Sequence, residues 1–235
     1  MRKLIFGLIV LALSLNAKEI YATFSVQAHQ NANLAFSSSG IVNKILVDVG
    51  STVEKNDILA QLQNNDLMAL YATSKTSLKY AKRNYDRQVK VKKIIDASKF
   101  DSYEQAYQSA KIQTVYQKAM LNKSILRAPF HGIITSKYLD KGAVVSGQSP
   151  TTIFNIQSID NLKLLVKFDS KYWQDVKKGD NFKYKLDGDT NEYNASISKV
   201  YPTIDTKTRM ISAEVIVKNL PIGLFGTGYI ITQNK

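Results

Sequence analysis

The hydrophobic positions of this 235-residue chain follow two different periods. In residues 63–124, apolar or small side chains recur every three or four positions, as on one face of a helix, and no glycine or proline interrupts them. The chain on both sides consists of short alternating runs separated by glycine or aspartate turns, which is typical of strands. The pattern therefore predicts an α+β protein in which a helical segment interrupts β structure.

A glycine-punctuated unit occurs on each side of this helical segment. The first copy contains Gly40 and Gly50, and the second repeats them 92 residues later at Gly132 and Gly142. Alternating apolar residues follow the first glycine of each copy, and a short apolar strand closes it. We expect all four glycines to form the turns of these units.

One such unit is too small to bury its apolar face, so the two units are expected to pack together. This predicts a single β-sandwich made of residues 37–62 and 125–157. Because the units must meet, the ends of the insertion must also lie close together. Its two helices are therefore predicted to run antiparallel, as a long hairpin over residues 63–124.

The facing stripes of the two helices are only weakly apolar. They contain Leu67, Tyr71, Ser74, Leu78, Ala81, Tyr85 and Val89 in the first helix, and Tyr103, Ala106 or Tyr107, Ala110, Thr114, Gln117 and Leu121 in the second. A hairpin with this interior is marginally stable alone, which favours an arm that binds partners over a helical layer packed on the β structure. Either Asp96 or Ser98 is a suitable N-cap for the second helix.

The remaining chain again shows strand-like alternation. Residues 19–36 and 158–219 contain several short alternating runs, which predict a small β-barrel. Residues 220–235 are then left as a C-terminal tail. Trp173 follows a strand and begins a short helical turn, so we expect it to fill the barrel core, with a recognition role as the alternative.

Composition narrows the possible functions. The chain has no cysteine and two histidines, so a thiolate nucleophile is excluded and a zinc or soft-metal site has few ligands available. No clustered acid, base and nucleophile suggests an enzyme. Residues 1–17 combine Arg2 and Lys3 with an apolar run shorter than the roughly 20 residues that span a bilayer, which predicts a secretory signal or an uncleaved anchor.

The formal net charge is +13, and export makes nucleic acid an unlikely partner. The predicted hairpin carries twelve Lys and Arg residues against five acids, a net charge of +7. A solvated helical surface would explain such a run, as would an acidic protein partner or an anionic membrane.

The two half-motifs, with Gly-x-Val followed by Asp-x-Gly, resemble the halves of a biotinyl/lipoyl domain. In a carrier of that kind a tight turn bears the modified lysine, whereas here the helical segment replaces the turn. A lipoyl-like domain split by a hairpin is similar to the periplasmic adaptors, or membrane fusion proteins, of tripartite efflux pumps. Residues 127–134 resemble that family's Arg-Ala-Pro-Phe-Asp-Gly-x-Val signature, with His131 in place of aspartate, and residues 197–219 resemble a stretch of its barrel.

The resemblance also implies a site at the tip of the hairpin. Arg87, Val91 and Ser98 match the spacing of a family motif of Arg, Leu and Ser, with valine in place of leucine. In the family these positions contact an outer-membrane channel. The resemblance further implies a non-enzymatic protein without a cofactor, which forms a ring, six copies in the family, and works with an inner-membrane transporter, RND rather than ABC.

The implied location is the periplasm, either free or associated with the inner membrane. The resemblance further implies a short form of the family that lacks most of the membrane-proximal domain, with residues 220–235 expected to be a tail or a remnant of that domain. The alternative function is an exported lipoyl-like carrier, or a module that binds a small ligand or a metal.

Overall fold

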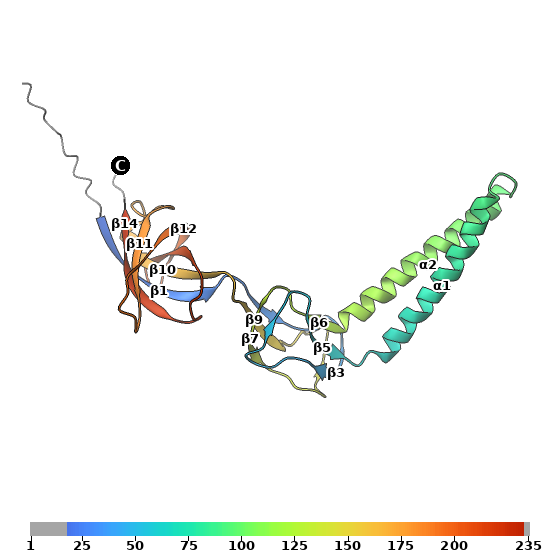
Figure 1. Ribbon diagram of the computed structural model, residues 1–235, viewed down its shortest axis with the longest axis horizontal. Coiled ribbons are helices and arrows are strands. Elements are labelled where there is room, and N and C mark those ends of the chain that lie inside the picture. The colour runs from blue at the N-terminus through green and yellow to red at the C-terminus, as the bar shows by residue number, and fades with distance from the viewer. Residues whose placement is uncertain (1–17, 233–235) are drawn as a thin grey trace, which may run out of the picture. The chain divides into compact units, whose positions relative to one another are not determined.

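The computed structural model describes residues 18–232, so the predicted signal, residues 1–17, lies outside the described residues. The described chain forms two compact units. One runs from Gln30 to Ser158, and the other combines the chain before and after it. The first unit contains a small sandwich and the helical hairpin, and the second is a β-barrel (Figure 1). This confirms the predicted fold class.

The sandwich consists of two four-stranded sheets. One has the order β2-β9-β7-β4 and the other β6-β5-β3-β8. Their bounds are β2 Asn31–Leu34, β3 Gly40–Ile45, β4 Thr52–Val53, β5 Ile58–Leu62, β6 Ile125–Arg127, β7 Gly132–Lys137, β8 Val144–Val145 and β9 Phe154–Ser158. Buried aliphatic and aromatic side chains from both sheets, including Val42, Leu59, Ile134 and Phe154, form one core between them.

The repeated half-motifs exchange strands in this sandwich. Gly40 of β3 pairs with Val145 of β8, and Gly132 of β7 pairs with Val53 of β4. Each sheet therefore contains a strand from the other half-motif. This exchange explains why neither half can bury its apolar face by itself.

The four motif glycines have two different structural roles. Gly50 and Gly142 have φ angles of 86° and 92°, so they form left-handed turns as predicted. Gly40 and Gly132 instead begin strands β3 and β7, which corrects the expectation that they form turns. A Cβ on Gly132 would lie 2.3 Å from the Gln157 carbonyl oxygen, so the neighbouring strand approaches too closely for any side chain.

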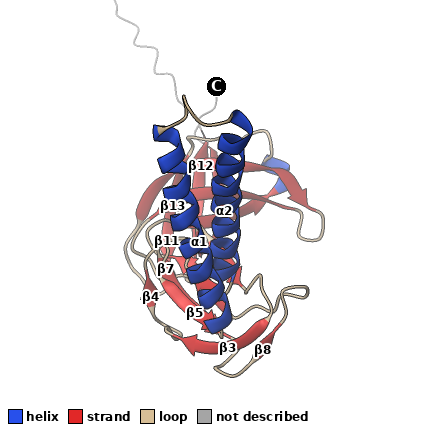
Figure 2. Ribbon diagram, turned by 90° about the vertical axis from the view of Figure 1, so that its right-hand side faces the viewer, coloured by secondary structure: helices blue, strands red, loops and turns tan. Residues whose placement is uncertain are grey.

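The hairpin consists of α1, Asn65–Lys90, and α2, Ala97–Lys123. It leaves the sandwich after β5 and returns at β6, and these two strands pair directly, with Gln61 opposite Ile125. At about 1.5 Å per residue, each helix is roughly 40 Å long. Figure 2 shows the two helices side by side. No described helix has both the length and the apolar character needed to cross a membrane.

The barrel closes in the strand order β1-β10-β13-β12-β11-β14. Its elements are β1 Lys18–Ala28, β10 Leu162–Asp169, the 3-10 turn η1 Ser170–Tyr172, β11 Asn181–Leu186, β12 Tyr193–Asp205, β13 Met210–Val217 and β14 Phe225–Thr232. Inward-facing residues fill the interior, and the rings of Phe24, Phe182 and Tyr184 pack against one another with centroids 5.3 to 5.7 Å apart.

The domain boundaries differ from the predicted ones at two places. Residues 220–235 are not only a tail, because β14 closes the barrel between β1 and β11. Its inward positions Gly226 and Gly228 lack side chains because the rings of Phe24 and Phe182 occupy that space, so the sequence shows no alternating apolar pattern there. Residues 31–34 form β2, which pairs with β9 of the sandwich rather than with the barrel.

Trp173 does not fill the barrel core. Its exposed fraction is 62%, whereas Val176, three residues later, is only 4% exposed and packs against the barrel interior. The short turn after β10 therefore inserts valine and leaves the indole in solvent, which corrects the sequence-based expectation.

Candidate partner-binding site at the hairpin tip

The helices of the hairpin contact each other through small and polar side chains. Ser74 and Thr114 are buried halfway along the contact. The Thr114 hydroxyl lies 3.0 Å from the Ser74 carbonyl oxygen and 2.8 Å from that of Ala110, so it donates within the interface. A polar interior of this kind is satisfied but buries little apolar surface. The structure thus places the predicted stripes face to face, with Tyr107 rather than Ala106 facing inward and Val89 exposed.

Aromatic side chains hold the helices together near the tip. The ring of Tyr85 stacks on Tyr107 at a centroid distance of 5.3 Å and lies 5.8 Å from the ring of Phe100. Phe100 is 5% exposed, and the ammonium of Lys92 lies 4.4 Å from its ring centroid. Phe100 therefore anchors the first turn of α2 against α1, a role that the sequence pattern did not indicate.

The loop between the helices is ordered by its own backbone. The carbonyl of Val91 accepts hydrogen bonds from the amides of Ile94 and Ile95, at 3.0 and 3.2 Å. The Asp96 carboxylate accepts from the Lys99 amide at 3.1 Å and so caps α2. Of the two predicted N-caps, Asp96 is the one used, and Ser98 lies inside the first turn of α2.

The three residues of the predicted tip motif lie around this loop. Arg87 is exposed in the last turn of α1, where its guanidinium donates to the side-chain oxygen of Asn84. Val91 directly follows α1 and is 39% exposed, and Ser98 is exposed in the first turn of α2. The fold therefore brings all three to one end of the hairpin, although their part in binding stays a prediction.

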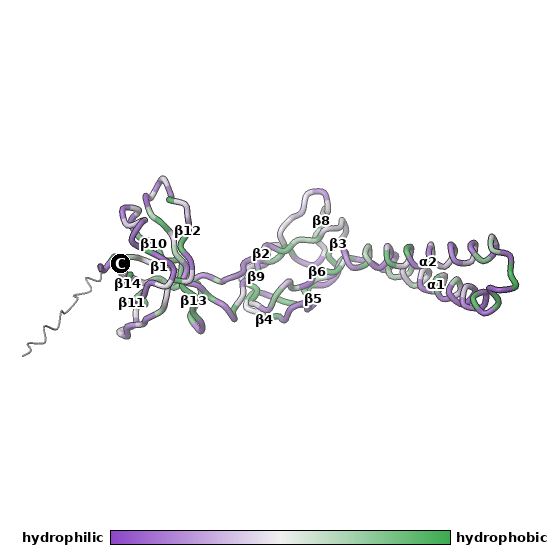
Figure 3. The backbone as a smooth tube through the Cα atoms, turned by 90° about the horizontal axis from the view of Figure 1, so that it is seen from above, coloured by the Kyte–Doolittle hydropathy of each residue, from purple (hydrophilic) through white to green (hydrophobic). Residues whose placement is uncertain are grey.

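A fourth residue at the tip was missed. Ile94 is 86% exposed, and Figure 3 shows hydrophobic character at the loop that joins α1 and α2. The Ile94-Ile95 pair within a lysine-rich stretch was the available signal. An isoleucine held in water beside cationic side chains suits a contact that combines apolar burial with charge.

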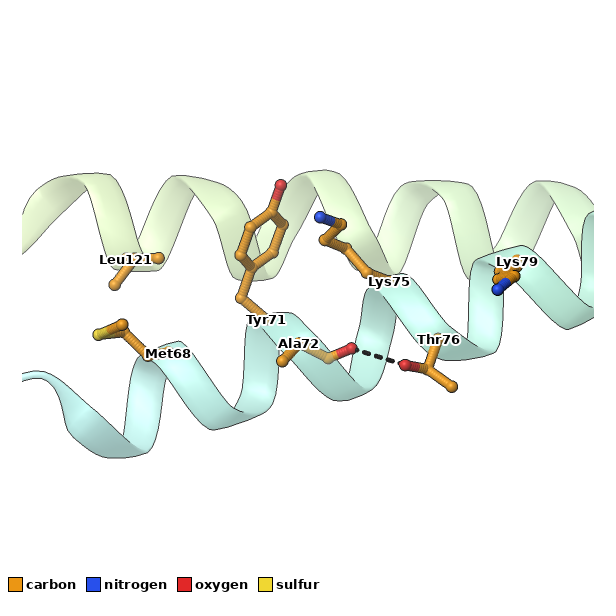
Figure 4. A pocket seen from close by; sticks show the side chains of 7 residues that line it. All are labelled: Met68, Tyr71, Ala72, Lys75, Thr76, Lys79 and Leu121. Carbon is orange, nitrogen blue, oxygen red and sulfur yellow. Dashed lines mark hydrogen bonds between the residues drawn. The ribbon is translucent and has the colours of Figure 1, made fainter.

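An open groove of about 650 Å³ lies near the base of the hairpin (Figure 4). Met68, Tyr71 and Leu121 make its apolar part, and Lys75 and Lys79 extend along α1 beyond them. No carboxylate lines it. The groove therefore adds a second basic and apolar surface to the same arm.

The sandwich itself offers little that could hold a cofactor. Within residues 18–232, no three His, Cys, Asp or Glu side chains gather as a metal site would require. His131 Nε2 lies 3.6 Å from the Glu54 carboxylate. Arg127 donates to the carbonyl of Asn56 at 2.8 Å. These two residues of the signature stretch therefore contact the turn between β4 and β5. Where a lipoyl carrier has its lysine-bearing turn, this chain has α1 and α2.

Comparison with known proteins agrees with this architecture. A family model described as the CzcB-like barrel-sandwich hybrid domain matches residues 30–157, which is more than half of the chain. Among curated proteins, the chain is 24% identical over 198 residues to the cobalt-zinc-cadmium resistance protein CzcB of Cupriavidus metallidurans, covering 77% of this chain and 38% of that protein.

Solved structures show the same fold. A MacA-MexA chimera that contains the Pseudomonas aeruginosa MexA α-hairpin domain superposes with a TM-score of 0.79 and 21% identity, covering 93% of this chain and 81% of that one. MacA from Actinobacillus actinomycetemcomitans superposes with a TM-score of 0.73 and 20% identity, covering 93% and 80%.

The chain spans only 38% to 51% of the length of the curated relatives that it matches. The family match nevertheless covers the whole sandwich and the hairpin inserted in it. The chain therefore belongs to the CzcB-like barrel-sandwich hybrid family, the membrane fusion or adaptor proteins of efflux systems.

Proposed function

We propose that this protein is a periplasmic adaptor of a tripartite efflux pump, which uses the tip of its hairpin to bind an outer-membrane channel. The observation that carries the proposal is the tip itself, where Arg87, Val91, Ile94 and Ser98 are exposed around one ordered loop. The two helices contact each other mainly through polar and small side chains. The exposed end of the hairpin is therefore better suited to contacting a partner than to packing on its own domain.

Each tip residue has a distinct part in the proposed contact. Arg87 donates charge-assisted hydrogen bonds to carbonyl or carboxylate oxygens of the channel. Val91 and Ile94 fill an apolar groove between channel helices. Ser98 bonds a backbone group across the contact, since Asp96 already caps α2 and leaves the Ser98 hydroxyl for another role.

The rest of the assembly follows from the family. We propose that several copies, six by analogy, form a ring around a conduit and that an RND-type inner-membrane transporter feeds it. The net charge of +7 on residues 63–124 opposes close packing of identical hairpins. Acidic surfaces on the channel offset that repulsion, which gives the basic arm a reason to prefer a different protein at its tip.

Site-specific cross-linking tests the proposal. A photo-reactive residue replaces Val91 at the tip, and a control chain carries it at Ile112, which is 69% exposed on α2. We expect the tip position to form adducts with an outer-membrane channel in intact envelopes, identified by mass spectrometry. Adding Arg87→Glu should lower that yield at least about tenfold, because it removes charge-assisted hydrogen bonds.

Arg83→Glu is the matched control, since Arg83 lies one turn earlier on α1 with its guanidinium over the Tyr80 ring. It makes the same change of charge and should leave the yield nearly unchanged. Equal channel adducts from Val91 and Ile112, or full capture by the Arg87→Glu chain, would show that the tip is not the binding site.

A further inference from the structure

Trp173 is the only tryptophan of the chain, and it stands exposed at one end of the barrel. It directly follows η1, whose last residue is Tyr172, and Lys171, Lys177 and Lys178 are exposed on the same connection between β10 and β11. Isolated exposed apolar residues are common on protein surfaces. An indole set among ammonium groups, however, has the composition of residues that sit at the water–lipid interface.

The same end of the barrel is where the chain arrives from residues 1–17. Lys18 begins β1, and its ammonium lies 2.6 Å from the Asp175 carboxylate and 4.6 Å from the centroid of the Tyr172 ring. The connection that carries Trp173 therefore contacts Lys18, the first residue after the apolar run of the sequence, through an ion pair and a cation–π contact.

The turn between β12 and β13 lies at this end too. Met210 pairs with Asp169, and the Ser170 amide donates to the Arg209 carbonyl at 3.0 Å. Ile204 is 47% exposed there, and Lys207 and Arg209 add two cations. Apolar and basic side chains from three separate parts of the barrel thus share one end.

The two ends of the barrel carry opposite charge. The cationic end has six basic residues, Lys18, Lys171, Lys177, Lys178, Lys207 and Arg209, against five acids, Glu19, Asp169, Asp175, Asp180 and Asp205. The other end has Lys185 and Lys218 against four acids, Asp160, Asp187, Asp189 and Glu192, of which Glu192 pairs with Lys185.

Four of these five acids face the protein's own groups, and Asp180 among them accepts from the Lys177 amide. Asp175 and Asp169 pair with Lys18 and Lys171, and Asp205 accepts from the amides of Lys207 and Thr208. Within residues 18–232, no carboxylate lies at ion-pair distance from Lys177, Lys178, Lys207 or Arg209, so these four cations are available to an external anion.

We infer that this end of the barrel docks on the surface of an anionic lipid bilayer, with the Trp173 ring at the level of the headgroups. Lysine stems can lie along the interface while their ammonium groups reach lipid phosphates. A lipid surface is favoured over a protein partner because Tyr172 and Trp173 stand among exposed lysines on the connection between β10 and β11, which is the mixture of side chains typical of the water–lipid interface. This inference concerns the barrel alone and does not depend on the partner of the hairpin tip.

Trp173 itself is the probe, because no other residue contributes indole fluorescence. The full-length chain is mixed with phosphatidylglycerol vesicles, with phosphatidylcholine vesicles, and with both lipids brominated near the headgroup. We expect a blue shift and bromine quenching of Trp173 in phosphatidylglycerol and little change in phosphatidylcholine. Raising the salt to 1 M shortens the Debye length to about 3 Å and should reverse the shift.

A triple variant tests the role of the local cations while keeping the probe. Lys171→Gln with Lys177→Gln and Lys178→Gln should lower partitioning of Trp173 into phosphatidylglycerol vesicles by up to roughly 150-fold, since each lysine near such a surface contributes about fivefold. The control triple, Lys183→Gln with Lys185→Gln and Lys199→Gln, removes the same charge from exposed positions on the barrel wall. It should retain most of the partitioning.

The comparison requires that both triple variants have the same thermal unfolding midpoint as the wild type, which is measured by circular dichroism. The inference is overturned if Trp173 stays in a water-like environment with anionic vesicles, or if both triples lose binding equally. Shielding of Trp173 only in vesicles that contain an inner-membrane transporter would assign this surface to a protein partner instead. Each of these results leaves the test of the hairpin tip unaffected.

Discussion

Gly40 and Gly132 occupy equivalent places in the two half-motifs, yet their surroundings differ. A Cβ on Gly40 would lie 3.2 Å from Cδ1 of Leu62, the end of a flexible side chain. A Cβ on Gly132 would lie 2.3 Å from a backbone oxygen of β9. The repeat therefore preserves glycine at both places, but only one of them is demanded by the backbone.

This difference predicts unequal effects of the same substitution. Gly132→Ala should lower the free energy of unfolding of the sandwich by about 1–3 kcal/mol, because strand β7 must move away from β9. Gly40→Ala should cost well under half as much, since the Leu62 side chain can shift. Urea denaturation of the two variants checks this, and equal losses would contradict the packing described for β7.

At the side of the barrel, Glu214 is nearly buried between two donors. Its carboxylate accepts from the Lys163 ammonium at 2.5 Å and from the Tyr201 hydroxyl at 2.6 Å. Burial raises the pKa of Glu214, but the hydrogen bonds from Lys163 and Tyr201 outweigh it, so the pKa lies below its ordinary value of 4.5. The same contact raises the pKa of Lys163, chiefly through the hydrogen bond to Glu214.

A lowered carboxyl pKa stabilises the fold above the ordinary value and loses that effect as the pH falls through the lowered pKa. Glu214→Gln should therefore destabilise the barrel by about 2 kcal/mol at neutral pH, with a smaller difference from wild type below pH 4.5. Thermal unfolding of both chains across this pH range measures it. Glu192→Gln, whose ion pair with Lys185 is on the surface, should change stability little at any pH.

At the scale of single elements, the hairpin depends on few strong contacts. Its interior is mostly small and polar, so the cluster of Tyr85, Phe100 and Tyr107 supplies much of the apolar burial near the tip. The loop that presents Val91 and Ile94 lies directly beyond this cluster. Order at the tip and stability of the cluster should therefore change together.

Phe100→Ala tests this coupling. Removing a buried phenylalanine costs about 3–5 kcal/mol in a full core, which exceeds what a marginal hairpin end can lose and still stay closed. We expect amides of residues 88–104 to exchange hydrogen much faster, while those of the sandwich keep their protection. Tyr116→Ala, at a position 52% exposed on α2, is the control and should leave exchange at the tip unchanged.

How much could be predicted from the sequence also differs between elements. The antiparallel hairpin was predictable because two half-motifs that must pair force the ends of the insertion together. Strand β14 was not predictable, because its inward positions Gly226 and Gly228, which lie against the rings of Phe24 and Phe182, have no side chains. The strand therefore lacks the alternating apolar pattern. Spacing indicated the positions of Arg87, Val91 and Ser98, whereas the exposure of Ile94 and Trp173 depends on how each turn orients its side chains.

At the scale of the whole molecule, two compact units have separate cores. The unit with the hairpin contains the proposed contact with a channel, and the barrel contains the proposed contact with lipid. Because the residues that carry them belong to different cores, the substitutions at one site should be silent at the other. The cross-linking and vesicle experiments can therefore be read independently.

The position of β14 has a consequence for the order in which the chain acquires structure. The first described strand, β1, pairs with the last, with Lys18 opposite Thr232, and Figure 1 shows the start of β1 beside the end of β14. Closing this pair costs the entropy of a loop almost as long as the protein. The local hairpin and sandwich can form while the C-terminal residues are still being synthesised. The barrel cannot close before β14 is available, so β1 stays unpaired on that side until then. A chaperone that shields β1 during this interval would act on the barrel alone.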